Sequence, residues 1–188
     1  TLTQNKMQVY ESRFFGMPSG CLRDDAVAEG MAVNSTASLD FSDPKSPQVL
    51  GNPTEGALLL WLDQQGVDYR QLREAASIDE ELPFSTERKY MATVVRSPRL
   101  GAQRVLYVKG APEIVLSLCV QTAGDVARET IDGWLAGYQG QAMRTLGFAS
   151  LPLKDGEEAI AEGKVVAKGL TFQGIVAISD PVRADVPA

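Results

Sequence analysis

The feature of this sequence that most constrains its fold is a pair of strand-like runs joined by a short turn. The runs cover residues 90–95 and 104–108, and residues 97–101 between them read Ser-Pro-Arg-Leu-Gly. A connection this short, containing Pro and Gly, predicts a β-hairpin and therefore an antiparallel sheet. Three further strand-like runs predict additional strands, over residues 7–15, 145–153 and 170–178.

Segments with a helical spacing of apolar residues lie between these strands. They predict helices over residues 21–33, 54–65, 69–76, 112–119 and 131–142. The pattern as a whole predicts an α+β fold, with a largely antiparallel twisted sheet flanked by helices.

The helix over residues 54–65 has the clearest boundaries. Asn52 suits an N-cap, Pro53 suits the first helical position and Gly66 suits a C-cap. Residues 34–49 before it are polar and contain Pro44 and Pro47, so we expect a mobile surface loop there.

The composition excludes several classes of function. The chain has 188 residues, of which 44% are hydrophobic, enough for one globular core. It has no run of about 18 apolar residues, so we expect no segment to span a bilayer. Histidine is absent and Cys21 is far from Cys119, which excludes the usual Cys/His zinc sites and histidine-based catalysis. We expect both thiols to be buried in a protein of a reducing compartment.

The charge of the chain limits its ligands. The net charge is −6 and no basic tract is longer than Arg88-Lys89, so we expect no nucleic-acid partner. A single nucleotide remains possible, because one anionic ligand needs only a few positive groups. The motifs GxxxxGK[ST] and GxGxxG are absent, so side chains of a cleft would have to hold that nucleotide.

Glu55, in the segment Gly51-Asn52-Pro53-Thr54-Glu55, has two interpretations. With Asn52 as N-cap, Glu55 occupies the third helical position, where a capping-box carboxylate belongs. The same carboxylate could instead accept a hydrogen bond from the exocyclic amine of adenine. The two roles are compatible.

Phe84 and Lys89 belong to the segment Pro83-Phe84-Ser85-Thr86-Glu87-Arg88-Lys89. A lone Phe is more often part of a core, but an exposed ring could stack on a purine. Lys89 would supply positive charge for phosphates, although a basic pair is usually a solvated strand edge.

Two more segments carry candidate binding residues. In Lys109-Gly110-Ala111-Pro112-Glu113, Gly110 relieves crowding at a turn and Pro112 suits the start of a helix. The Lys109 ammonium would then reach any cleft at that strand end, although a lone Lys there normally faces solvent. In Met143-Arg144-Thr145-Leu146, Arg144 could pair with a phosphate or a carboxylate, or could stabilise the helix C-terminus before it.

These segments, in this order, resemble the P-type ATPases, above all the branch of the calcium pumps and their sodium/potassium, proton and magnesium-transporting relatives. The ends of the chain add to the resemblance. Thr1-Leu2-Thr3 is similar to the end of the family signature Asp-Lys-Thr-Gly-Thr-Leu-Thr, whose phosphorylated Asp would lie upstream. Residues 180–183, Asp-Pro-Val-Arg, resemble the Asp-Pro-Pro-Arg hinge, with Val182 in place of the commoner Pro.

The resemblance implies a division of the chain. Residues 1–6 would be a remnant of the phosphorylation-domain signature and first hinge. Residues 7–176 would form the nucleotide-binding domain, and residues 177–188 the return hinge. Because the chain begins at Thr1 without a signal peptide, we expect an excised fragment, monomeric and inactive alone.

The resemblance also implies a nucleotide site. Phe84 would stack on adenine, Glu55 would accept from its amine, and Lys109 with Gly110 would line the floor of the pocket. Three cations would serve the phosphates: Lys89, Arg144 at the mouth and Arg183 in the hinge. Thr86 departs from the calcium pumps of muscle type, which have a basic residue there.

The implied function is that of an ATP-binding, cytoplasmic domain of a membrane cation pump. MgATP would transfer its γ-phosphate to an aspartate of the phosphorylation domain, driving transport of an ion, with Ca²⁺ expected from general similarity. The actuator and transmembrane domains of the parent would be the other partners. Two alternatives stay open: a stand-alone soluble nucleotide hydrolase, and a non-nucleotide regulatory module of the same fold.

Overall fold

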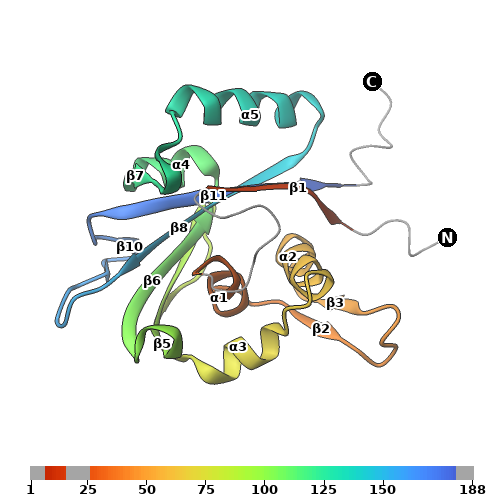
Figure 1. The fold of residues 1–188 in the computed structure, drawn as a ribbon, viewed down its shortest axis with the longest axis horizontal. Coiled ribbons are helices and arrows are strands. Elements are labelled where there is room, and N and C mark those ends of the chain that lie inside the picture. Colours follow the sequence, from red (N-terminus) through yellow and green to blue (C-terminus); the bar gives the residue numbers. More distant parts are fainter. Residues whose placement is uncertain (1–6, 16–25, 181–188) are drawn as a thin grey trace.

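The computed structural model describes residues 7–15 and 26–180, and a twisted sheet forms its centre (Figure 1). Seven described strands form this sheet, in the order β1-β11-β8-β6-β5-β4, with β7 also paired to β11. The strands are β1 (Gln8–Phe14), β4 (Ser77–Leu82), β5 (Tyr90–Ser97), β6 (Gln103–Gly110), β7 (Cys119–Thr122), β8 (Arg144–Pro152) and β11 (Leu170–Ser179). All pairs are antiparallel except β7 with β11. The predicted α+β fold with a largely antiparallel sheet is confirmed.

The predicted hairpin is the regular centre of the sheet. Strands β5 and β6 pair without interruption from Tyr90 opposite Gly110 to Ser97 opposite Gln103. A single 3₁₀ turn, Pro98–Leu100, joins them and ends at Gly101, whose φ of +65° is readily adopted by glycine.

The helices cover both faces of the sheet (Figure 1). On one face lie α1 (Ala26–Val33), α2 (Pro53–Gln64) and α3 (Tyr69–Ala75), and on the other α4 (Pro112–Ser117) and α5 (Arg128–Gly140). Neighbouring residues of β5 serve different cores: Val94 packs in the cluster that contains Ile131 of α5, whereas Val95 packs with Val33 of α1. This alternation is the period of two that a doubly covered strand requires.

The structure differs from the sequence-based expectation mainly in short or charged strands. Strand β4 was not predicted, because its sequence, SIDEEL, is acidic and mostly exposed. Ion pairs hold it to the sheet instead: Asp79 contacts Arg96 and Arg104, and Glu80 contacts Arg104. Arg96 lies on β5, which pairs with β4, and Arg104 lies on β6, the next strand beyond it. Opposite charges across strands stabilise a sheet, and the sequence of one strand alone does not reveal its partners.

The expected loop over residues 34–49 is also partly wrong. It contains one strand of a small hairpin and most of the other, β2 (Ser38–Asp40) and β3 (Gln48–Leu50). A second small hairpin, β9 (Ile160–Ala161) with β10 (Lys164–Val165), lies between β8 and β11. These strands are too short to show a periodic pattern.

The helix boundaries shift by a few residues. The C-cap of α2 is Gln65, and Gly66 follows it with a φ of +81°. Helix α5 begins at Arg128 rather than residue 131. The expected start of the first helix at Cys21 lies outside the described residues, as do residues 1–6 and 181–188. Strand β11 crosses residue 176 without a break, and the division of the chain at that point stays a prediction.

The central sheet makes a prediction about stability. Leu106 of β6 is fully buried, whereas Leu50 of β3 is 51% exposed. We expect Leu106→Ala to lower the free energy of unfolding by about 2–5 kcal/mol, from lost transfer energy and the cavity left behind. Leu50→Ala is the matched control, expected to cost less than about 1 kcal/mol. Urea unfolding of both variants measures this, and equal costs would contradict the assignment of the core.

Candidate functional site: a cleft above a buried ion pair

A cleft of about 570 Å³ opens at one end of the sheet. It lies where α2 begins, where β4 leads into β5, and where β6 ends beside the start of β8. A volume of this size is typical of a small-molecule site. Its lining residues are Thr36, Asn52, Thr54, Glu55, Pro83, Phe84, Met91, Lys109, Gly110, Arg144, Thr145 and Leu146.

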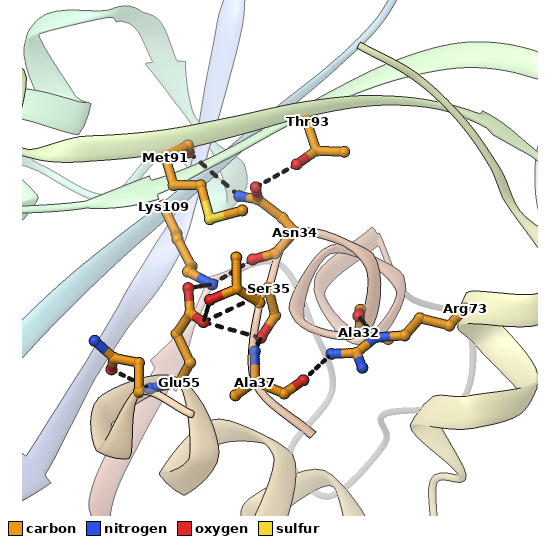
Figure 2. A network of polar contacts seen from close by, with 11 residues as sticks. Ala32, Asn34, Ser35, Ala37, Glu55, Arg73, Met91, Thr93 and Lys109 are labelled. Atoms are coloured by element: carbon orange, nitrogen blue, oxygen red, sulfur yellow. Dashed lines mark hydrogen bonds and ion pairs between the residues drawn. The ribbon is translucent and has the colours of Figure 1, made fainter. Parts of the chain in front are cut away.

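An ion pair between Glu55 and Lys109 forms the floor of this cleft (Figure 2). Glu55 Oε1 and Lys109 Nζ are 3.0 Å apart, and their side chains are only 11% and 6% exposed. Glu55 comes from the first turn of α2 and Lys109 from the penultimate residue of β6. The structure thus brings together two residues that the sequence singled out separately.

The second carboxylate oxygen of Glu55 is held by the segment after α1. Oε2 accepts hydrogen bonds from the backbone N–H and the hydroxyl of Thr36, both at 2.8 Å, and from the Ser35 hydroxyl at 3.3 Å. Asn52 caps α2 as predicted, accepting from the Glu55 N–H at 3.0 Å. The carboxylate therefore bonds Thr36 and Lys109, so the capping-box interpretation is confirmed only for the Asn52 half.

Lys109 is the more deeply buried partner. Besides the ion pair, its ammonium donates to the backbone carbonyl of Asn34 (Figure 2). Burial lowers the pKa of Lys109, although the charge of Glu55 opposes that shift. Burial would raise the pKa of Glu55, but the charge of Lys109 and hydrogen bonds from Lys109 and Thr36 hold that pKa below its ordinary value. At the floor of the cleft, the charge of each group therefore favours the ionised form of the other.

Phe84 also lines the cleft and is 57% exposed. Its ring is therefore available to a ligand rather than packed in a core. Arg88 holds the loop that carries it, because its guanidinium donates to the Pro83 carbonyl and to Gly163 O at 3.1 Å. The two residues of the predicted solvated basic pair therefore differ in their environment, because Arg88 links the loop to the turn between β9 and β10.

Gly110 allows the chain to pass closely at the cleft edge. A Cβ at this position would lie 2.3 Å from the Lys89 carbonyl oxygen and 2.6 Å from the Tyr90 Cα. Both are backbone atoms, so no side chain fits without moving β5. Gly110 therefore contributes close packing of β6 against β5.

The remaining predicted cations are less central. Arg144 lines the cleft and pairs with Asp180, Nε to Oδ2 at 3.4 Å, linking the Met-Arg-Thr-Leu segment to the Asp-Pro-Val-Arg segment. Lys89 is exposed, has a φ of +66° and is not among the lining residues. Arg183 lies outside the described residues.

Sequence reasoning missed Asn34 and Thr36, which contact Lys109 and Glu55 directly. They lie in a polar segment whose local pattern does not distinguish them from ordinary loop residues. Among the described residues no group of three or more His, Cys, Asp or Glu side chains could hold a metal ion. Of the two thiols, Cys119 is half-buried, and burial raises its pKa to about 12.

The ion pair predicts a pH dependence of stability. Because the pKa of Glu55 in the folded chain is below its ordinary 4.5, the contribution of the carboxylate is complete above that value and is lost as the pH falls through the lower folded value. Glu55→Gln leaves Lys109 unpaired, so we expect a loss of about 3–5 kcal/mol at neutral pH. The loss should shrink as the pH falls below 4.5.

Urea unfolding of parent and variant across this pH range measures the difference. Glu81→Gln changes an exposed carboxylate of β4 and is the matched control, expected to follow the parent at every pH. A constant difference between Glu55→Gln and the parent from neutral to acidic pH would contradict the assignment.

Comparisons with known proteins agree with this architecture. The model of the "P-type ATPase, cytoplasmic domain N" family matches residues 24–185. "Calcium-transporting ATPase PAT1" of Dictyostelium discoideum is 32% identical over 100% of this chain and 18% of its own length. "Calcium-transporting ATPase 1" of Lactococcus lactis is 31% identical over 99% of this chain and 22% of its own. "Plasma membrane calcium-transporting ATPase 4" of Bos taurus is 30% identical over 100% and 18%.

The chain thus spans about a fifth of the length of these relatives. Among the helices that the structure describes, none has the length and apolar character needed to cross a membrane. The family model covers most of the chain, including every described residue of the cleft. The chain therefore belongs to the P-type ATPases, as their cytoplasmic domain N.

Proposed function

We propose that this chain binds the adenosine part of MgATP and presents the γ-phosphate to an aspartate in a neighbouring domain of a cation pump. The observation that carries the proposal is the cleft in which an exposed aromatic ring, Phe84, faces a space whose floor is the buried Glu55–Lys109 pair. A flat purine base and a hydrogen-bonding edge are what such a cleft can recognise.

The proposed roles follow from the chemistry of adenine. The base stacks on Phe84, an interaction worth about 1–3 kcal/mol. Its exocyclic amine donates to Glu55, whose Oε1 retains acceptor capacity beside Lys109. Guanine presents a carbonyl oxygen at the corresponding position, which the carboxylate would repel. The cleft should therefore prefer ATP over GTP.

The phosphates would extend toward the mouth of the cleft, where Arg144 supplies positive charge. Glu55 is the one carboxylate among the described lining residues and is already paired, so Mg²⁺ would be held by the phosphates and by residues outside this chain. We assign Lys89 and Arg183 to the phosphate end as well. Phosphoryl transfer depends mainly on such positioning and charge neutralisation.

The pairing of the first and last described strands supports the proposal of a hinge at the ends of this domain. Strands β1 and β11 lie side by side, with Gln8 opposite Ser179 (Figure 1). Residues 1–6 and 177–188 would then connect this domain to the phosphorylation domain, with the actuator and transmembrane domains beyond it. The names of the relatives favour Ca²⁺ as the transported ion.

The adenine site predicts weak, ATP-selective binding. Titration of the labelled chain with ATP and with GTP, followed by amide chemical shifts, should map ATP to Glu55, Phe84 and Lys109. Phe84→Ala should weaken binding about 5-fold to 150-fold, the equivalent of one stacking interaction. Tyr10→Ala is the control, because Tyr10 is 55% exposed and is absent from the cleft lining. No shifts at these three residues in excess ATP would refute the adenine site.

The alternative of a stand-alone hydrolase predicts a different outcome. If the acceptor aspartate lies in another domain, the purified chain should release no inorganic phosphate from MgATP above the uncatalysed background. A phosphate-release assay measures this, with the Phe84→Ala variant as the comparison. Turnover that Phe84→Ala abolishes would favour the hydrolase. An absence of both binding and turnover would favour the regulatory module.

A further inference from the structure

Asn34 connects the two charged residues of the cleft floor with the central sheet. It follows α1 directly, and its N–H donates to Gly30 O at 2.9 Å. Its side chain is 1% exposed, which is unusual for an amide. A buried amide is expected to have its hydrogen bonds satisfied, so its partners show what it holds in place.

The side chain of Asn34 is bound to β5 through both ends of its amide (Figure 2). Nδ2 donates to the Met91 carbonyl at 3.3 Å, and Oδ1 accepts from the Thr93 hydroxyl at 2.6 Å. Met91 lies one residue beyond the last pair of β4 with β5. A short side chain that both donates and accepts is required here, and Ala or Val could do neither.

The backbone of the same segment holds the ion pair. The Asn34 carbonyl accepts from the Lys109 ammonium, and Thr36, two residues later, donates twice to Glu55. Arg73 of α3 fixes the segment from its other side, donating to Ala32 O at 2.6 Å and to Ala37 O at 2.7 Å. The side-chain hydrogen bonds of Asn34 link this segment to β5, the strand that pairs with β6, and Lys109 projects from β6.

We propose that Asn34 is a positioning residue for nucleotide selection, because its side-chain bonds to β5 fix the backbone that sets the Lys109–Glu55 pair. The inference rests on the proposed function of the cleft. Loss of the side chain leaves the segment able to move relative to β5, and the carboxylate then no longer has one defined position. Recognition of an adenine edge requires groups held to within a fraction of an ångström.

Three variants test this inference. Asn34→Ala removes both side-chain bonds, and Thr93→Val removes one of them while preserving the shape of a buried residue. Ser97→Ala is the matched control: Ser97 is on the same strand, is fully buried and donates to Glu29 Oε2 at 2.8 Å, but it is absent from the cleft lining. Thermal unfolding gives the temperature at which each variant begins to unfold, and all binding measurements are made below that temperature.

The first measurement is the dissociation constant for ATP and its ratio to that for GTP. Asn34→Ala should weaken ATP binding about five-fold or more and bring the ratio toward one, since an unmade buried hydrogen bond costs at least about 1 kcal/mol. Thr93→Val should act in the same direction, and Ser97→Ala should change neither quantity by more than about two-fold. A folded Asn34→Ala variant with the parent's affinity and ratio would overturn the proposal.

The second measurement needs no nucleotide. Nuclear magnetic resonance of the Lys109 side chain gives its titration midpoint, which burial depresses in the parent. Asn34→Ala and Thr93→Val should move it toward the ordinary 10.5 as water enters, whereas Ser97→Ala should not. If Asn34→Ala does not fold, Thr93→Val decides: an unchanged midpoint overturns the proposal. Failure of the parent to bind ATP would instead contradict the proposed function, and the midpoints would still test what Asn34 positions.

Discussion

The candidate site depends on one buried ion pair, Glu55 with Lys109. Removing two charges from water is costly, and a buried pair is often no more stable than well-packed apolar residues in its place. The pair is therefore poorly explained by stability alone. The neighbouring residues Asn34, Ser35 and Thr36 offset this desolvation cost, because they supply the remaining hydrogen bonds of the two charged groups. A carboxylate held in this way is a fixed acceptor at the floor of a cleft, which is what recognition of a donating base requires.

The sheet order explains how separate sequence segments form one site. Strands β5, β6 and β8 are antiparallel neighbours, so the loop before β5, the end of β6 and the start of β8 meet at the same end of the sheet. Helix α2 adds Glu55, whose carboxylate points toward Lys109 of β6 (Figure 2). The Arg144–Asp180 pair then joins the cleft to the end of β11, next to β1. The same arrangement that builds the cleft thus connects it to both ends of the domain.

Local signals predicted the parts of this structure that depend on local chemistry. The β5–β6 hairpin and the Asn52 cap of α2 follow from a short Pro/Gly turn and an Asn-Pro start, and both are confirmed. Strand β4 and the bonds of Asn34 depend on partners far along the chain, and no periodicity reveals them. The sequence indicates Phe84 as a candidate but does not predict whether its ring is exposed, because the exposure depends on how Arg88 holds the loop.

The most direct test of the central claim is the measurement of nuclear Overhauser effects between ATP and the isotope-labelled chain. An adenine site in this cleft predicts contacts from the adenine H2 and H8 protons to the Phe84 ring, together with contacts from the base to the side chain of Lys109. The ribose and phosphates should lie nearer Arg144. Contacts of the base with residues outside the cleft at saturating ATP, or the absence of any contact with Phe84, would contradict an adenine site in this cleft.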